Sequence, residues 1–540
     1  MLGQRSDQRG LFEADTVHLD FVGRGSFYGF LASQRGKLFR DDEFKALYVL
    51  DNGCPCVPPS LLATALLLQT YDRVSDEEAK ARADFDLRWK VALGIELESR
   101  PFAKSTLQLF RAQLILHDEV RKVFKKSLAF ARESGHLKNR KSKLAVDTSN
   151  ILGRGAVKDT YNLLADGIVK LVGTLAGLKA VKPAEWAEAN NLSRYFTPAS
   201  IKGEADIDWS KPKVRQEFLQ SIVADADVLL EATRQTLSDY PAESPEYKKL
   251  TEASDLLSRL LLQDIERTPD GASIKQEVSR DRIPSVHDPE MRHGRKSKAK
   301  RFDGHKGAIA VDTESQLITA VDVLPGNAPD NEKALELVKQ SEENAEIEVE
   351  ETIADCAYGD GGTRQGFADA DRTLVAKVPD RPQTEQFPKE DFKIDLEKMT
   401  CTCPAGHECR TVVPNGHRKD RHGKELELKS FRFDAKICDI CPQRSQCVKA
   451  ALGKGRTVAI HPQERLVQQA RAFQKSDAFA PYRALRQAAE HRLARLMQLG
   501  TRQARYFGRR KTLFQLLMAA TVANLTLVAT KTGQMRAAYR

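Results

Sequence analysis

Two short stretches, Lys143-Leu-Ala-Val-Asp147 and Ile347-Glu-Val-Glu-Glu-Thr-Ile-Ala-Asp355, decide which fold we expect. Each is an apolar or partly alternating run of strand-forming residues, and each ends on an aspartate. Thr148, Ser149 and Asn150 favour a turn directly after Asp147. We therefore predict two strands with a carboxylate at the end of each, and the two carboxylates would meet at one edge of a sheet.

Further strand-like runs lie between and after these stretches. Residues 307–311 and 316–324 are apolar and are separated by residues 312–315, so they predict a hairpin. A helix is expected from Asn331 to about Val338, and a last strand from Thr373 to Val378. A strand, a hairpin, a helix and a strand in this order predict an α/β protein with an RNase H-like mixed sheet as its core.

Helical periodicity fills much of the remaining chain, whose length of 540 residues predicts two or three structural units. Apolar residues recur at helix spacing from Pro58 to about Phe130. This pattern predicts an all-α N-terminal domain over residues 1–135, which could bind DNA. The first part of the core would span residues 136–380, with a helical insertion at about 155–280.

The third carboxylate that such a core needs is expected on a later helix. Residues 456–540 predict C-terminal helices that complete the core, and the helix from Tyr482 to Leu499 has one apolar face. Glu490 lies in this helix, and Glu464 is the alternative. Hard cations prefer oxygen ligands, and two ions about 4 Å apart can serve both the attacking and the leaving oxygen of a phosphodiester reaction. We therefore predict Mg²⁺ or Mn²⁺ at three carboxylates: Asp147, Asp355 and Glu490.

The charge balance suits a polyanionic partner. Lys and Arg number 85 against 75 Asp and Glu, which gives a net charge of +10 and a pI near 9.0. Basic residues gather in residues 121–143, 292–306 and 502–511, and any of these stretches could also be a solvated face. The second stretch comprises Arg292, Arg295, Lys296, Lys298, Lys300, Arg301 and Lys306. From it we take Lys296, Arg301 and Lys306 as DNA-binding candidates.

The sequence predicts no membrane span. The longest apolar run, Leu516 to Thr530, includes Asn524 and is shorter than the roughly 18 residues that a span needs. We expect a buried helix there. Residues 5–9 are polar, unlike the apolar core of a signal peptide. These features predict a cytoplasmic protein.

Six of the nine cysteines lie between Cys401 and Cys447. A Cys-x-x-Cys pair with further thiols nearby is typical of tetrahedral zinc sites. We predict a structural zinc ion on four thiolates: Cys403, Cys438, Cys441 and Cys447. The first ligand could instead be Cys401, Cys409 or His407. Zinc would stabilise a zinc-ribbon-like insert over residues 381–455, and unligated thiols in a loop are the alternative.

These motifs resemble, over most of the chain, the insertion-sequence DDE transposases, and among them most closely the group numbered eleven-eighty-two, which is related to the broader IS-four and IS-five types. The resemblance rests on four phrases: Ser285-Val-His-Asp-Pro-Glu-Met-Arg-His-Gly-Arg-Lys-Ser297, Gly304-His-Lys306, Gly326-Asn327 with Asp330, and Asp355-Cys-Ala-Tyr358.

The helix that carries Glu490 resembles the Tyr, Arg, Glu, Lys signature of related transposases. Arg486 stands four positions before Glu490, as the signature requires. Tyr482 stands four positions before Arg486, where the signature has three. Met497 occupies the position, seven after Glu490, where the signature has a Lys, and Arg492 or Arg495 could supply that charge. The resemblance implies that Tyr482, Arg486 and Arg495 contact the DNA backbone near the cut. An ion pair within the helix is the alternative for Arg486.

The resemblance implies a transposase that cuts DNA at the ends of an insertion sequence and joins the freed 3′ hydroxyl to target DNA, with Asp147, Asp355 and Glu490 as metal ligands. Its partners would be double-stranded DNA, both terminal inverted repeats and target, and a second copy of the chain. Three alternatives stay open: an inactive or domesticated DNA-binding relative, an RNase H-like nuclease without strand transfer, and a zinc-dependent regulator. For His305 and Lys306 a structural role is the alternative to DNA contact.

Overall fold

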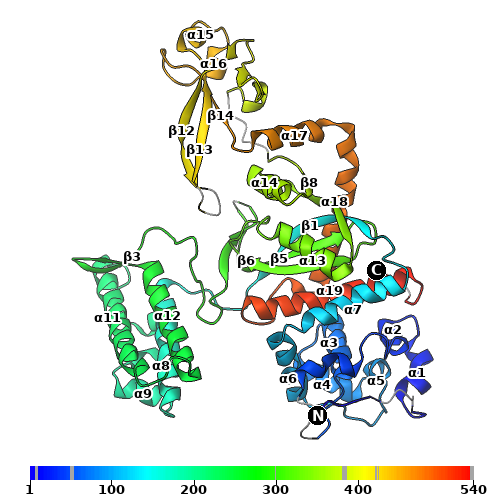
Figure 1. The fold of residues 1–540 in the computed structure, drawn as a ribbon. Helices are drawn as coiled ribbons and strands as arrows, with labels where there is room; N and C mark the ends of the chain where they lie inside the picture. The colour runs from blue at the N-terminus through cyan, green and yellow to red at the C-terminus, as the bar shows by residue number, and fades with distance from the viewer. Residues whose placement is uncertain are drawn as a thin grey trace.

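The computed structural model describes residues 1–5, 10–48, 54–297, 299–379, 386–419, 423 and 425–535. Lys298 and residues 6–9, which entered the sequence argument, lie outside the described residues. Figure 1 shows the N-terminal helices at the bottom, the mixed sheet in the centre, the helical insertion to the left and the cysteine-rich region at the top.

The N-terminal region is helical, as predicted. The Ser75 hydroxyl accepts a hydrogen bond of 3.1 Å from the Glu78 N–H and so caps α4. The central helix α3 is buried along most of its length. The elements are α1 (Ala14–Val22), α2 (Phe27–Ser33), η1 (Asp41–Leu47), α3 (Pro59–Asp72), α4 (Asp76–Phe85), α5 (Leu87–Leu93), α6 (Lys104–Leu116) and α7 (Val120–Glu133).

The central sheet is mixed and has the order β4-β5-β1-β7-β8, with β6 also paired to β5. Strand β5 runs antiparallel to its neighbours β1, β4 and β6, whereas β1, β7 and β8 are parallel. The strands are β1 (Lys141–Leu152), β4 (Arg292–Arg295), β5 (Arg301–Asp312), β6 (Ile318–Pro325), β7 (Glu348–Ala354) and β8 (Thr373–Ala376). Helix α13 (Ala334–Ala345) leads into β7, and α14 (Gly361–Asp369) leads into β8. The predicted hairpin and the strand before Asp355 are confirmed.

The expected end of the first strand at Asp147 is wrong. Strand β1 continues to Leu152, so Asp147 lies near its middle. Residues 148–152 pair with β5, in a register that sets Asn150 opposite Lys306. The hydrogen bonds of this ladder outweigh the local turn preference of Thr148, Ser149 and Asn150.

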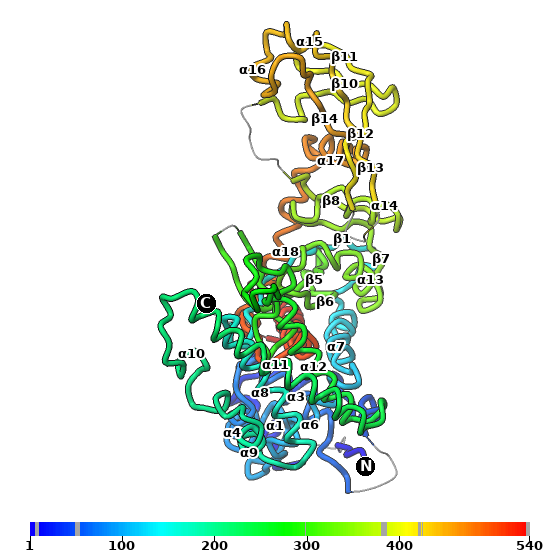
Figure 2. Tube along the Cα trace, turned by 90° about the vertical axis from the view of Figure 1, so that its left-hand side faces the viewer, coloured from blue at the N-terminus to red at the C-terminus, as the bar shows by residue number. Residues whose placement is uncertain are grey.

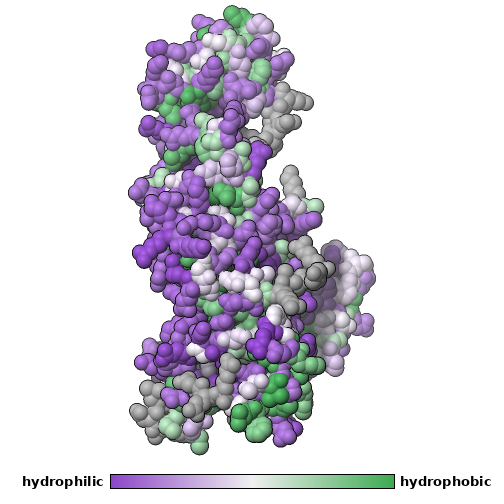
Figure 3. All heavy atoms as spheres, turned by 90° about the vertical axis from the view of Figure 1, so that its right-hand side faces the viewer, coloured by the Kyte–Doolittle hydropathy of each residue, from purple (hydrophilic) through white to green (hydrophobic). Residues whose placement is uncertain are grey.

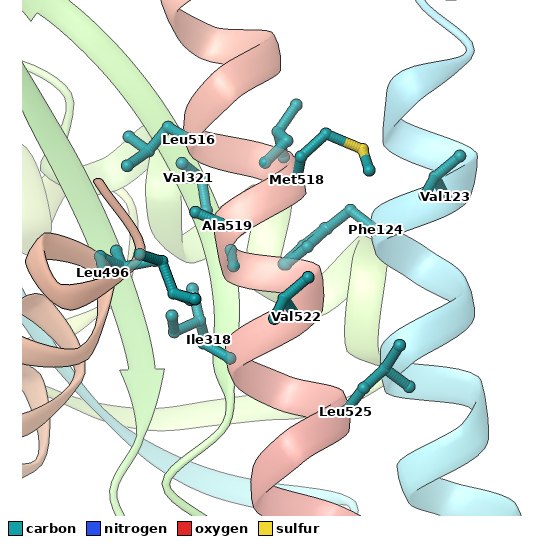
Figure 4. Close-up of a cluster of buried hydrophobic side chains, with 14 of the residues drawn as sticks. Val123, Phe124, Ile318, Val321, Leu496, Leu516, Met518, Ala519, Val522 and Leu525 are labelled. Atoms are coloured by element: carbon teal, nitrogen blue, oxygen red, sulfur yellow. The ribbon is translucent and has the colours of Figure 1, made fainter. Parts of the chain in front are cut away.

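Helix α19 (Arg509–Lys531) is the central helix of the core. It packs against α7 on one side and β6 on the other, as Figure 4 shows for Phe124, Ala519 and Val321. Among the described residues α19 alone is long and apolar enough to cross a membrane, but 83% of its most apolar window is buried in the protein. The side chain of Asn524 bonds both the N–H and the C=O of Ile318 at 2.9 Å. The predicted buried helix is therefore confirmed.

The helical insertion forms a lobe beside the sheet with an apolar core of its own (Figures 1 and 2). Its core is built from α8, α11 and α12 together with shorter segments. The elements are α8 (Thr160–Leu178), α9 (Pro183–Ala189), η2 (Ser193–Tyr195), α10 (Ile201–Glu204), α11 (Pro212–Leu237), α12 (Pro245–Asp264), β2 (Ile265–Thr268) and β3 (Gly271–Ile274).

The cysteine-rich region forms the far end of the molecule in Figure 2. Two small three-stranded sheets, β11-β10-β9 and β12-β13-β14, enclose a small apolar core. Its elements are η4 (Lys389–Asp391), β9 (Lys393–Asp395), β10 (Thr400–Thr402), β11 (Glu408–Cys409), β12 (Val412–Lys419), β13 (Glu425–Arg432), α15 (Ala435–Asp439), α16 (Arg444–Cys447) and β14 (Thr457–Ile460). The chain then returns to the sheet through α17 (Glu464–Lys475), η5 (Asp477–Phe479), α18 (Ala480–Leu496) and the π-helical segment η6 (Met497–Thr501).

The surface is largely hydrophilic on the face shown in Figure 3, with an apolar patch over the N-terminal helices. Large apolar side chains that are about 60–80% exposed lie at and just before α1: Leu11, Phe12, Val17 and Phe21.

Candidate functional site

Strand register brings Asp147 and Asp355 together. In the parallel pairing of β1 with β7, Ala145 stands opposite Ile353, and the two aspartates lie two residues further along. Side chains two residues apart point to the same face of a sheet, so both carboxylates lie on one face. The Asp355 carboxylate accepts the Ala357 N–H at 2.8 Å and caps η3 (Cys356–Tyr358). This turn fixes Asp355 directly beyond the end of β7.

Helix α18 brings Glu490 to the same place. It packs against β1 and β7, and Tyr482, Arg486 and Glu490 recur every four residues along it. The Arg486 guanidinium donates a hydrogen bond to Glu490, and its Nη1 lies 4.0 Å from Asp147 Oδ2. Arg486 thus lies between Asp147 and Glu490, and its contact with Glu490 is the intrahelical ion pair expected as the alternative.

The electrostatics of Asp147 reflect this crowding. Burial and the negative charges of Asp355 and Glu490 raise its pKa to about 6. The hydrogen bond from the Thr148 N–H and the positive charge of Arg486 act in the opposite direction and lower the pKa. The Asp147 side chain is only 18% exposed, so water screens this repulsion poorly. A cation among the carboxylates would relieve the repulsion.

Tyr358 is a member of the site whose role the sequence did not reveal. Its side chain is fully buried, and its hydroxyl has no hydrogen-bond partner among the described residues. Burial raises the pKa of Tyr358 well above its ordinary value, and the charges of Asp147, Asp330 and Asp355 add to the rise. The hydroxyl therefore lies near the carboxylates. The sequence phrase Asp355 to Tyr358 contains this tyrosine, but only the structure shows that its side chain is buried.

The donor set suits a hard divalent cation, which prefers oxygen ligands: Asp147 lies near Asp355 and the exposed Glu490, and the buried Tyr358 hydroxyl has no partner among the described residues. No group of three Cys, His, Asp or Glu side chains within the described ranges is already arranged to hold a metal ion. The Arg486 guanidinium is the cation that lies among the carboxylates in this structure. Metal binding at this site would therefore require the Arg486 and Glu490 side chains to separate.

Tyr482 anchors α18 to the sheet in this structure, and its contact with DNA stays a prediction. Its hydroxyl lies 2.9 Å from both carboxylate oxygens of Glu351. The Lys143 ammonium binds Glu351 at 2.7 Å and lies 5.3 Å from the centre of the Tyr482 ring. The hydroxyl is thus already satisfied within the protein. Glu351 and Lys143, which the sequence argument did not single out, hold the helix that carries Glu490.

The basic candidates of the second stretch divide into exposed and buried residues. Lys296 and Arg301 are exposed at the β4–β5 hairpin, where a nucleic acid could reach them. Lys306 is buried, and its ammonium donates to the Ala328 carbonyl and to Asp330, both at 2.7 Å. Because its charge already has partners inside the protein, the structure favours the structural alternative for Lys306 over contact with DNA. His305 is likewise fully buried, 3.3 Å from Asp288.

The alternative third carboxylate, Glu464, is committed elsewhere. It is buried at the start of α17 in an ion pair with Lys389, and it also accepts the N–H of His461 at 2.9 Å. A carboxylate in these contacts is not free to join Asp147. The structure therefore favours Glu490 over Glu464.

Four cysteines line one small cavity of about 20 Å³, which has room for a single water molecule or ion. They are the four predicted zinc ligands: Cys403, Cys438, Cys441 and Cys447. Burial raises the pKa of Cys447, and the neighbouring thiols Cys438, Cys403 and Cys441 contribute to this rise while Arg456 opposes it. The thiols are thus neighbours, although they do not form a finished metal-binding geometry within the part of the chain that is described.

The other two cysteines of the region have different surroundings. Cys401 and Cys409 are buried and face each other across β10 and β11. The Cys409 thiol donates to the backbone carbonyls of Thr411 and Arg432, at 3.7 and 3.1 Å. These contacts make both residues part of the apolar core of the region.

The mixed sheet and the helical N-terminal region together fit a DDE transposase. The family model described as Transposase DDE domain matches residues 402–529, and the model described as Transposase domain (DUF772) matches residues 24–113. The two matches support an insertion-sequence DDE transposase family and a transposase function for this chain. No curated protein and no solved structure matches it.

Proposed function

We propose that this protein is a DNA transposase that cuts the ends of an insertion sequence and transfers them to target DNA, with Asp147, Asp355 and Glu490 as its metal ligands. The observation that carries the proposal is that Asp147 of β1 lies near Asp355, which follows the neighbouring strand β7, and is linked through Arg486 to Glu490 of α18. The strand order and directions, with β5 antiparallel between β6 and β1, support an RNase H-like core. The match to a transposase model across Glu490 supports the same assignment.

The carboxylates would hold two Mg²⁺ or Mn²⁺ ions, which when bound activate the attacking oxygen and stabilise the leaving one. Asp147 and Asp355, fixed by the sheet and by the η3 turn, would define the ion positions. Glu490 would complete the set once it parts from Arg486. The freed Arg486 guanidinium could then bind a phosphate of the DNA backbone. Tyr482, Glu351 and Lys143 hold α18 in the register that this exchange needs.

The test uses DNA that carries the sequences flanking the coding region on both sides. Purified protein with Mg²⁺ is expected to nick or cut this DNA and to join its 3′ ends to a second duplex. The variants Asp147→Asn, Asp355→Asn and Glu490→Gln are expected to lose at least about a thousandfold in rate, because each removes a charge on which transition-state stabilisation depends. Glu350→Gln is the matched control, since Glu350 is an exposed β7 residue paired with Lys141.

The outcomes separate the alternatives. Cleavage without joining of pre-cut ends would identify a nuclease instead of a transposase. DNA binding without metal-dependent cleavage in the wild-type protein would identify an inactive relative. Full activity of Asp147→Asn would refute the assignment of the site.

We also propose that Cys403, Cys438, Cys441 and Cys447 bind a structural zinc ion. The support is their common cavity and the mutual electrostatic influence of their thiols. Four thiolates form a closed tetrahedral site, which would stabilise a region with a small apolar core. The expected result is about one zinc ion per chain by elemental analysis, with loss of zinc in Cys441→Ser and retention in Cys356→Ser, a control at an exposed cysteine. A zinc-free protein with an unchanged melting temperature would refute the site.

Pairing of two element ends would require two copies of the chain. The exposed apolar side chains at and before α1 support this region as the dimer contact, because apolar patches of this kind mark interaction surfaces. Sedimentation of Phe21→Glu with and without DNA tests this. The variant is expected to stay monomeric on DNA where the wild-type protein dimerises, and unchanged dimerisation would exclude the region.

A further inference from the structure

A cavity of about 550 Å³ lies between the N-terminal helices and the C-terminal helices. Its walls come from the end of α3, the start of α4, the chain after β1, and the segment from η6 into α19. These walls include parts of both segments that the transposase models match, residues 24–113 and 402–529. The cavity therefore lies at the seam where these two segments meet.

The lining of this seam cavity is cationic. It contains Arg73, Arg154 and Arg505 together with three glutamines, and no Asp or Glu. Among the described residues no carboxylate pairs with Arg73 or Arg154; Arg154 donates to the backbone carbonyl of Arg505 and lies 5.7 Å from the centre of the Phe507 ring. Arg505 lies 3.3 Å from Asp76, but that carboxylate is already bound bidentately by Arg111 at 2.7 Å. Positive charge at the cavity thus exceeds the negative charge available to it.

The helix that leads from Glu490 to the cavity is cationic as well. Arg492 and Arg495 lie three residues apart on α18, and the chain continues directly into η6, whose Leu499 lines the cavity. The Arg492 Nε is buried without a partner among the described residues. Both guanidinium groups are partly buried, and no carboxylate among the described residues pairs with either of them. Two such neighbouring groups are suited to an anion that they bind jointly.

The seam cavity lies at a defined distance from the carboxylates. Nine residues of helix separate Glu490 from Leu499, which is about 14 Å at a rise of about 1.5 Å per residue. Five residues of strand separate Asp147 from the end of β1, about 17 Å at roughly 3.3 Å per residue, and Arg154 follows two residues later. Successive phosphates of one DNA strand rise by about 3.4 Å, so this distance corresponds to about four to six base pairs.

We propose that the seam cavity binds a DNA backbone segment about four to six base pairs from the reacting phosphodiester, with Arg73, Arg154 and Arg505 contacting its phosphates. The inference rests on the proposed function, because it names a second contact of the same DNA. Its chemistry is that of guanidinium groups binding phosphate oxygens. The cavity is larger than a phosphate group, so the attached sugar also has room.

The experiment measures binding of a flanking-sequence duplex to the Asp147→Asn protein, which removes cleavage from the readout. Fluorescence anisotropy is recorded over a salt series for the parent and for Arg73→Gln/Arg154→Gln. Each lost phosphate contact reduces the slope of log affinity against log salt by about 0.9, so the double variant should be about 2 shallower. Arg73→Lys/Arg154→Lys should keep the parent slope, since the charges remain. Arg24→Gln, which removes an exposed charge paired with Asp20, is the matched control.

A second variant tests the proposal even if the double glutamine variant folds poorly. Gln503→Glu places a carboxylate in the cavity without removing an arginine, and it should weaken DNA binding at low salt. In an ethylation-interference assay, ethylation of phosphates four to six positions from the cut is expected to weaken binding. This interference should be absent in the double glutamine variant.

Each outcome decides something. If the double glutamine variant melts like the parent and keeps its full slope, the seam proposal is wrong while the transposase proposal stands. If wild-type protein binds duplex DNA with a slope that depends on these arginines but never cuts it, the transposase proposal fails alone. If wild-type protein binds no duplex DNA, both fail.

Discussion

Asp147→Asn should stabilise the metal-free protein although it abolishes the proposed activity. The pKa of Asp147 rises from the ordinary 3.8 to about 6 in the folded chain, because the carboxylate is buried beside Asp355 and Glu490. At roughly 1.4 kcal/mol per pKa unit, keeping this carboxylate ionised costs about 3 kcal/mol of folding free energy. Asparagine has the same shape, carries no charge, and can still accept the Thr148 N–H through its Oδ1.

The sign of the effect fixes its dependence on pH. The folded protein holds the Asp147 proton more tightly than the unfolded chain does, so the wild-type protein loses stability as pH rises from about 4 to about 6. The asparagine variant has no such loss from this position. The two proteins should therefore be equally stable near pH 4, and above about pH 6 the variant should be more stable by about 3 kcal/mol.

The assay is thermal or urea unfolding in a chelator at pH 4 and at pH 8. If the 540 residues unfold as one unit, an unfolding entropy of about 2 cal/mol/K per residue converts about 3 kcal/mol into about 3 °C. Mg²⁺ should raise the melting temperature of the wild-type protein more than that of the variant, because it binds only the intact carboxylate set.

A matched charge change provides the control for this prediction. Asp20→Asn removes the same charge from an exposed ion pair with Arg24, and it should change stability little at either pH. Equal stability of Asp147→Asn and wild type at pH 8, or a difference that does not depend on pH, would refute the electrostatic account of the site.

Three other substitutions test the packing that surrounds the site. Asn524→Ala should cost about 3 kcal/mol in urea unfolding, because it leaves the buried N–H and C=O of Ile318 without their side-chain partner. Lys389→Met should cost about 3–5 kcal/mol by the same assay, since it strands the buried Glu464 carboxylate, and adding Glu464→Gln should recover part of the loss. Tyr482→Phe should cost about 1–2 kcal/mol in stability and leave the affinity for DNA unchanged, whereas weaker DNA binding at the same salt concentration would support Tyr482 as a phosphate contact.

The parts of the fold that follow local patterns could be predicted from the sequence. The β5–β6 hairpin, β7 and α18 have strong periodicity, and their locations agree with the structure. The end of β1 could not be predicted, because Thr148 to Leu152 lack the local signal of a strand and are held by pairing with β5. That partner lies about 155 residues further along the chain, beyond the reach of any local pattern.

The candidate acidic residues could be named from the sequence, whereas the surroundings of the basic residues could not. The phrases around Asp147, Asp355 and Glu490 single out three carboxylates, and the structure places Asp147 near the other two, while their role as metal ligands stays a prediction. The basic residues are harder, because a lysine in a basic stretch has the same letter whether it is exposed or buried. Lys296 is exposed, while Lys306, only ten positions later, is buried and donates a hydrogen bond to Asp330. Lys296 lies in the exposed connection between β4 and β5, whereas Lys306 lies inside β5, which is buried from Gly304 onward.

The continuation of β1 beyond Asp147 has a mechanical consequence. The same strand that positions Asp147 ends at Leu152, whose backbone bonds Arg502 and Ala504, next to the seam cavity. Helix α18 forms a second connection between the carboxylates and the cavity, because it carries Glu490 and continues through η6 into the cavity wall. Two rigid elements thus join the carboxylates to the seam arginines. A strand and a helix resist bending far better than a loop, so DNA held at the seam would be presented to the carboxylates at a nearly fixed distance.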